Sequence, residues 1–194
     1  LMFATQLGNL DIVSLLCNAK DIKITRVNKR GTSALFIACQ NGFIKILETM
    51  LKTARCCGET IDINQVNKQG VTLLFIACYN GKINIVNRLL CEKEIDVNRS
   101  THNKNFPLFT ACRQRYLNIV KRLLKTKEIN INKVDANNLS PLYIACQDGL
   151  TEVVELLLGE KRLDCNIPNK NGVTPLFIAC AQGYTKIVKC LICR

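Results

Sequence analysis

Short apolar runs recur along the chain at nearly constant intervals, and an amphipathic stretch follows each of them. The run Leu35-Phe36-Ile37-Ala38-Cys39 returns with small edits at 74–78, 108–112, 142–146 and 176–180. The cysteines of these five runs are 39, 34, 34 and 34 residues apart. A period of this length is typical of a stacked array of small units rather than of one globular fold.

Residues at the ends of each run predict a short helix. A hydroxyl side chain stands where the N-cap is expected in four copies, as Ser33, Thr72, Ser140 and Thr174. Proline occupies the first helical position in three copies, where its missing N–H costs nothing: Pro107, Pro141 and Pro175. Glycine ends four of the helices and supplies the left-handed cap: Gly42, Gly81, Gly149 and Gly183.

A second helix with one apolar face follows in every copy. Over residues 44–53, isoleucine, leucine and methionine recur at helical spacing, whereas Lys45, Glu48 and Lys52 fall on the opposite face. Comparable helices are predicted over 83–91, 117–125, 151–159 and 185–193, and residues 9–16 show the same pattern. Segments such as Ile95-Asp96-Val97-Asn98 join the units and are expected to pair loosely as hairpins. The sequence thus predicts an all-α repeat solenoid.

The chain resembles ankyrin-repeat proteins over essentially its whole length. Residues 174–179, Thr-Pro-Leu-Phe-Ile-Ala, match the Thr-Pro-Leu-His-x-Ala signature of that family except at the histidine. In the five full copies that histidine is replaced by an aromatic residue, for which we expect apolar contact between neighbouring units: Phe36, Phe75, Phe109, Tyr143 and Phe177. The resemblance implies one ankyrin-repeat domain over 1–194, made of helix-turn-helix repeats stacked with short hairpin-like connecting loops.

Six repeats are expected, with the first and last incomplete: approximately 1–27, 28–66, 67–100, 101–134, 135–168 and 169–194. Because residues 1–6 align with 35–40, the chain is expected to begin inside a repeat and to be part of a longer protein. The second repeat carries five more residues than the third, around Cys56-Cys57. We interpret them as a second helix longer by about one turn, with a functional loop as the alternative.

Composition changes this picture little. No apolar run has the roughly 20 residues that a membrane-spanning helix needs. The five repeated cysteines occupy a position that favours a small buried side chain, which predicts free thiols and a reducing, intracellular, cytoplasmic location.

The net charge is +12. A basic chain of this kind suits an acidic partner, but a compositional bias toward Lys, Asn and Ile is the favoured explanation of the charge.

Catalytic chemistry finds no support in the pattern. His102 is the single histidine and lies at a predicted turn tip, without a neighbouring nucleophile and carboxylate. Cys190 and Cys193 have the spacing of metal ligands, but no second pair accompanies them. We therefore predict no enzyme activity, no cofactor and no metal.

Function is expected where the copies differ. The resemblance implies that partners dock on the concave side, built from turn tips and first helices. The repeat that begins at Thr101 departs most: Lys104 replaces the turn glycine, Phe106 the N-cap hydroxyl and Arg115 the glycine that ends the first helix. We predict partner-binding residues at Lys29, Arg30, Lys68, Tyr79, Asn80, His102, Lys104, Phe106, Arg113, Gln114, Arg115 and Tyr116.

Two functions follow from these observations. The first is a monomeric, non-catalytic scaffold that binds a protein or peptide, with an acidic partner favoured by the charge. The alternative is a basic surface that binds nucleic acid, phosphoinositide or another anionic lipid, or a phosphorylated peptide. Arg and Tyr are common at the energetic centres of protein interfaces, which favours the first function for the repeat at Thr101.

Overall fold

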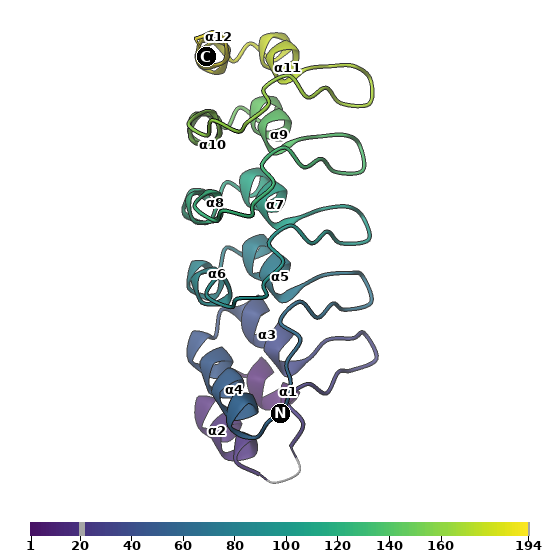
Figure 1. Cartoon of the computed structure of the whole chain (residues 1–194), viewed down its shortest axis with the longest axis vertical. Coiled ribbons are helices and arrows are strands. Elements are labelled where there is room, and N and C mark those ends of the chain that lie inside the picture. Colours follow the sequence, from purple (N-terminus) through teal and green to yellow (C-terminus); the bar gives the residue numbers. More distant parts are fainter. Residues whose placement is uncertain (20–21, 194) are drawn as a thin grey trace. The chain divides into compact units, whose positions relative to one another are not determined.

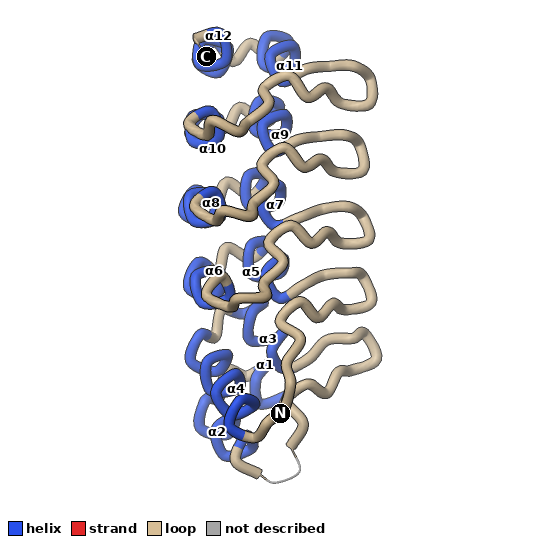
Figure 2. The backbone as a smooth tube through the Cα atoms, viewed as in Figure 1, coloured by secondary structure: helices blue, strands red, loops and turns tan. Residues whose placement is uncertain are grey.

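The computed structural model describes residues 1–19 and 22–193, which fall into two compact units. The first unit ends at Asp96 and the second begins at Val97. All regular elements in the described part of the chain are helices, joined by turns and by longer loops (Figure 2). The predicted all-α repeat solenoid is therefore confirmed.

The first unit stacks three helix pairs (Figure 1). The first helix of each pair packs on the next, and the second helices of the first two pairs pack on each other. The helices are α1 (Met2–Gln6), α2 (Leu10–Cys17), α3 (Ala34–Asn41), α4 (Ile44–Cys56), α5 (Leu73–Tyr79) and α6 (Ile83–Leu89). Helix α4 continues to Cys56, which confirms that the extra residues lengthen this helix.

The second unit repeats the same arrangement. Helix α9 packs between α7 and α11, and α10 packs between α8 and α12. The helices are α7 (Pro107–Arg113), α8 (Leu117–Leu124), α9 (Pro141–Gln147), α10 (Thr151–Leu158), α11 (Pro175–Ala181) and α12 (Thr185–Ile192). Helices α8, α10 and α12 each end one residue before the predicted end.

Side-chain caps begin the first helices where the sequence predicts them. The Ser33 hydroxyl accepts a hydrogen bond from the Phe36 N–H at 3.2 Å, and the Thr72 hydroxyl accepts one from the Phe75 N–H at 3.0 Å. Gly42 ends α3 in the left-handed conformation with φ of +85°. Local sequence and helix boundaries therefore agree in these repeats.

The repeated cysteines lie in the core with one exception. The side chains of Cys39, Cys78, Cys112 and Cys146 are fully buried, but Cys180 is exposed. Helix α9 has a first helix on both sides, whereas α11 packs on α9 alone among the first helices. The prediction of five equivalent buried cysteines was therefore wrong for Cys180. All twelve cysteines are free thiols.

The aromatic residues at the histidine position are buried in four copies. Phe36, Phe75, Phe109 and Tyr143 are at most 8% exposed, whereas Phe177 is 61% exposed. The Tyr143 hydroxyl also accepts a hydrogen bond from the Asn169 amide of the following repeat, at 3.0 Å. Apolar contact thus replaces the histidine hydrogen bond, with one polar substitute at Tyr143.

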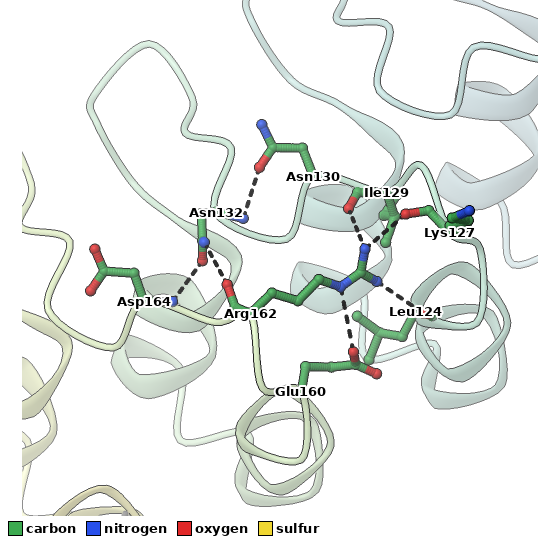
Figure 3. Close-up of polar contacts among 8 residues, drawn as sticks. All are labelled: Leu124, Lys127, Ile129, Asn130, Asn132, Glu160, Arg162 and Asp164. Carbon is green, nitrogen blue, oxygen red and sulfur yellow. Dashed lines mark hydrogen bonds and ion pairs between the residues drawn. The ribbon is translucent and has the colours of Figure 1, made fainter.

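Asparagine side chains link consecutive connecting loops. In the second unit, the Asn132 amide donates to the Arg162 carbonyl at 2.8 Å and its oxygen accepts the Asp164 N–H at 2.9 Å (Figure 3). Asn98 makes the same pair of bonds one repeat earlier, and Asn64 makes it within the first unit. The loops that follow such segments are hairpin-like, as predicted: in the first unit, isolated antiparallel bridges join Val27 to Ser33 and Val66 to Thr72.

The Arg162 side chain closes the end of helix α8. Its guanidinium donates to the carbonyls of Lys127 at 2.9 Å, Ile129 at 3.3 Å and Leu124 at 3.4 Å (Figure 3). Carbonyl groups at a helix C-terminus lack partners inside the helix. A charged donor from the following repeat supplies them here.

Candidate partner-binding surface

Two hairpin-shaped loops, residues 28–32 and 67–71, form one edge of the first unit. The Asn28 amide oxygen accepts the N–H groups of Arg30 at 2.8 Å and Thr32 at 3.0 Å, and Asn67 does the same in the next loop. The Lys68 N–H donates to the Arg30 carbonyl at 3.1 Å, which joins the two tips. The loops are therefore held by their own hydrogen bonds and by each other.

Gly31 is required at this junction for two reasons. Its φ is +74°, a conformation that other residues rarely adopt. A Cβ atom at this position would also lie 3.1 Å from the Lys68 backbone nitrogen and 3.2 Å from the Asn67 Cα atom. The close approach of the two loops therefore depends on a residue without a side chain.

A pocket of ≈ 410 Å³ lies between these loops and the first helices. Phe36 and Ile76 contribute apolar groups from α3 and α5, and Val71 contributes one from the second loop. Arg30 and Lys68 line the same pocket and are exposed. The combination of an apolar lining with two cations suits a ligand that carries both an apolar group and a negative charge.

Charge is one-sided on this surface. Residues 28–43 and 66–81 contain Lys29, Arg30 and Lys68, and no Asp or Glu. Tyr79 extends the surface at the end of α5, where it is 49% exposed and stacks on Phe75 with ring centroids 6.3 Å apart. We call these two segments together the hairpin surface of the first unit.

Asn80 follows Tyr79 and contributes less to this surface. It is half-buried, and its side-chain amide donates to the Ile76 carbonyl at 2.9 Å. The amide therefore already has a partner within its own repeat, and the bond helps to end helix α5.

The second unit brings most of its predicted site residues to the surface. His102, Lys104, Arg113, Gln114 and Arg115 are exposed, and Tyr116 is half-buried. Lys104 and Arg115 adopt positive φ of +59° and +62°. Strain of about 1 kcal/mol for each residue is the ordinary cost of this conformation outside glycine.

The structure corrects the assignment of Phe106. Its side chain is 1% exposed, so it is not available to a partner. The ring packs against Phe109 with centroids 5.6 Å apart, and the Lys133 ammonium lies 5.4 Å from its centroid. Phe106 gives no side-chain cap to α7, as expected, but it replaces that cap with core packing.

Arg115 lines a second, smaller pocket of ≈ 270 Å³ with Leu117, Gly149 and Glu152. One of its guanidinium nitrogens lies 3.5 Å from the Asp148 carbonyl oxygen, at the long limit of a hydrogen bond. Gly149 is the residue equivalent to Arg115 in the next repeat. A Cβ atom added to Gly149 would lie 2.8 Å from the Tyr184 ring. Arginine at 115 therefore occupies space that this later repeat gives to an aromatic ring.

The described residues hold no arrangement suited to metal binding, since no three His, Cys, Asp or Glu side chains among them are grouped as ligands. Burial raises the pKa of the Cys146 thiol to about 12, with a smaller contribution from nearby Cys165. Thiols of this kind stay protonated and react slowly. Within the same part of the chain, no helix is both long and apolar enough to cross a bilayer.

Stacked helix pairs with hairpin-shaped loops define the chain as an α-helical repeat protein. Its sequence matches the family described as "Ankyrin repeats (3 copies)" over residues 1–60, 56–135 and 127–194. The chain therefore belongs to the ankyrin repeat family. Repeats of this family generally serve as protein–protein interaction modules and are typically non-catalytic.

Comparison with solved structures supports the same fold. The ankyrin repeat protein EF0377 is similar with a TM-score of 0.88 and 22% identity, over 98% of this chain and 94% of that chain. This likeness concerns the fold alone. No curated protein matched the sequence.

The sequence located most of the exposed residues but missed the apolar lining of the first pocket. Phe36 was expected to join neighbouring repeats, and Ile76 was not singled out. The apolar residues of the pocket lie beside Arg30 and Lys68 because the loops fold against the first helices. The sequence alone did not show this arrangement.

Proposed function

We propose that the chain binds an acidic, extended segment of a partner protein on the hairpin surface of the first unit. An apolar side chain of that segment enters the pocket beside Phe36 and Ile76, and its carboxylates face Arg30 and Lys68. This is the concave side that the family resemblance implies.

The distribution of charge carries this proposal. The chain has 15 acidic residues, yet residues 28–43 and 66–81 contain none of them. Residues 97–127 and 165–194 also lack Asp and Glu, so the charge argument rests on the exposed cations Lys29, Arg30 and Lys68 at the rim of the pocket. Like-signed charges on a binding surface favour partners of the opposite sign and speed their association.

The apolar lining favours a peptide over a nucleic acid. Proteins bind single-stranded nucleic acid with cations that contact the phosphates and with aromatic rings that stack on the bases. Here Phe36 is 6% exposed and is not free to stack, and the exposed Tyr79 ring already stacks on Phe75. A pocket with apolar walls and two cations at its rim instead fits a single apolar side chain flanked by carboxylates.

A display selection with random peptides against the full chain tests the proposal. Selected peptides are expected to combine one large apolar residue with two or more acidic residues. The triple variant Lys29→Ala, Arg30→Ala, Lys68→Ala is expected to bind them about 10- to 100-fold more weakly, since each rim charge contributes about 0.5–1 kcal/mol. Gln40→Glu, which adds one carboxylate beside the pocket at constant size, is expected to weaken binding as well.

A matched control carries the same change in net charge away from the surface. Lys45, Lys52 and Lys93 are exposed and lie outside the hairpin surface. Their replacement with alanine is expected to leave affinity nearly unchanged. Equal weakening by both triple variants, or selection of basic or uncharged peptides, would contradict the proposal. Preferential binding of single-stranded oligonucleotides would support the alternative function.

Arg113 and Arg115 form a second candidate contact in the second unit. Both are exposed and lie at the end of helix α7. The double variant Arg113→Ala, Arg115→Ala is expected to weaken binding of a protein partner, with a free energy of unfolding within about 1 kcal/mol of the parent. Unchanged affinity in a titration of a folded double variant would refute this role.

A monomer in the reducing cytoplasm completes the proposal. Twelve free thiols, five of them exposed at Cys56, Cys57, Cys91, Cys180 and Cys193, fit a compartment in which disulfides rarely form. Sedimentation of the reduced chain at increasing concentration tests the monomeric state, and a dimer at low concentration would contradict it.

A further inference from the structure

The open face of helix α5 is apolar. Of its seven residues, Leu73–Tyr79, all are buried except Ile76 and Tyr79. Ile76 lines the pocket of the hairpin surface, and Tyr79 is 49% exposed. Residues three apart on a helix lie on the same face, with Cβ atoms about 5–6 Å apart. Ile76 and Tyr79 therefore form one apolar patch that begins in the pocket and continues to the end of α5.

The repeat fold does not require a tyrosine at position 79. The equivalent residue in each full copy follows the repeated cysteine, and in the other four copies it is polar, charged or small: Gln40, Arg113, Gln147 and Ala181. The first helices of these copies form as α5 does. From residue 67 to residue 175, Tyr79 is also the one large apolar side chain that is exposed. Its exposed area is thus available for contact with another molecule.

Charge and stacking decide which kind of group covers the exposed part of this ring. The faces of an aromatic ring attract cations and other rings. A cation of the partner is repelled on the hairpin surface, which contains Lys29, Arg30 and Lys68 and no Asp or Glu. A further ring competes with Phe75, on which Tyr79 already stacks with ring planes 20° apart. An aliphatic side chain needs neither a free ring face nor a charge, because it gains from the apolar area that it removes from water.

The spacing of the patch fits an extended peptide. Side chains on one face of an extended chain are two residues apart, a separation of about 6.6–6.8 Å. This is close to the Cβ separation of about 5–6 Å expected between Ile76 and Tyr79. A peptide residue in the pocket beside Ile76 therefore places the side chain two positions away over Tyr79, while the side chain between them points away from the surface.

We propose that Tyr79 is a specificity-determining residue of the hairpin surface, which selects a partner segment with a second aliphatic residue two positions from the residue in the pocket. The first residue enters the pocket beside Phe36 and Ile76, and the second covers the exposed part of the Tyr79 ring. This inference rests on the proposed function and adds a second anchor to it. Apolar burial at two points then distinguishes the partner from other acidic segments, which share only its charge.

Binding of synthetic acidic peptides to the full chain tests the proposal. Each peptide contains two leucines in a background of Asp, Glu and Ser, and the second leucine lies one, two or three positions after the first. A fourth peptide contains a single leucine. The peptide with leucines two positions apart is expected to bind about 3- to 10-fold more tightly than the other three, because only this spacing buries both side chains on the patch.

Two substitutions separate the effect of the ring from that of the rest of the surface. Tyr79→Gln introduces the residue that α3 and α9 carry at this position. This variant is expected to lose the advantage of the two-position spacing, while its affinity for the single-leucine peptide stays within about twofold of the parent. Tyr79→Phe keeps the ring and is expected to keep the advantage. Circular dichroism checks that both variants are folded, as glutamine at the equivalent positions predicts.

Three results would overturn the proposal. The first is equal affinity for all three spacings, the second is a preference for another spacing, and the third is the same preference in Tyr79→Gln as in the parent. In each case the proposed function survives if the Lys29, Arg30, Lys68 triple alanine variant binds the peptides more weakly than the parent. Equal binding by that variant and the parent, or no binding of any peptide, would instead contradict the proposed function and this inference together.

Discussion

Replacement of Phe106 by serine distinguishes the structure from the repeat pattern most sharply. Four other repeats place a serine or threonine with a bonded cap at this position: Ser33, Thr72, Ser140 and Thr174. The pattern alone therefore predicts that Phe106→Ser restores a missing cap and stabilises the chain by about 1 kcal/mol.

The structure predicts the opposite sign. Phe106 is 1% exposed and packs on Phe109 and beneath the Lys133 ammonium. Removal of a buried phenylalanine side chain costs about 3–5 kcal/mol, which includes its aromatic and cation contacts. A new cap returns about 1 kcal/mol, so Phe106→Ser is expected to destabilise the chain by about 2–4 kcal/mol.

Urea unfolding followed by circular dichroism measures this difference. With a slope of about 2 kcal/mol per molar urea, the midpoint is expected to fall by about 1–2 M. Ser140→Ala is the matched control, because it removes a cap without opening the core and is expected to cost about 1 kcal/mol. A Phe106→Ser variant as stable as the parent, or more stable, would refute the assignment of Phe106 to the core.

Three further predictions concern stability and reactivity. Asn132→Ala removes two hydrogen bonds between loops and is expected to cost about 1–3 kcal/mol in urea unfolding, whereas an exposed change such as Asn137→Ala serves as control. Arg115→Gly removes the strain of a positive φ, which costs about 1 kcal/mol in arginine. The greater conformational freedom of glycine in the unfolded chain offsets part of this gain. Thermal unfolding of the variant is therefore expected at an equal or higher temperature than in the parent. Burial raises the pKa of Glu59, but hydrogen bonds from Thr25 and Ile24 outweigh it and lower the pKa on balance. The pKa of Glu59 is therefore lower in the folded chain than in the unfolded chain. The stability that this carboxylate contributes is present above the unfolded pKa and is lost as pH falls through the folded pKa. Glu59→Gln is expected to reduce this loss of stability at acidic pH, measured as the free energy of unfolding against pH.

Local sequence predicted the first helices well because most of them have a side-chain cap at their start. Ser33 and Gly42 determine the start and end of α3 without help from distant residues. The period of the apolar runs then specifies how helices stack, since only a neighbouring repeat can cover their apolar faces. Fold class was therefore accessible from the sequence alone.

Side chains that act between repeats were not accessible in the same way. The interactions of Asn132 span 30 and 32 residues, and nothing in its immediate neighbours marks it. Phe106 looked like a surface residue because it replaced a hydroxyl group, and only the packing showed that it had turned inward.

Photo-crosslinking of a selected peptide to the full chain tests the central claim most directly. A photoreactive group at the apolar position of the peptide is expected to label residues within 28–43 and 66–81, close to Phe36 and Ile76. Labelling is expected to disappear in the Lys29, Arg30, Lys68 triple alanine variant and to persist in the Lys45, Lys52, Lys93 control. Crosslinks confined to the outer faces of α4 and α6 would contradict binding on the hairpin surface.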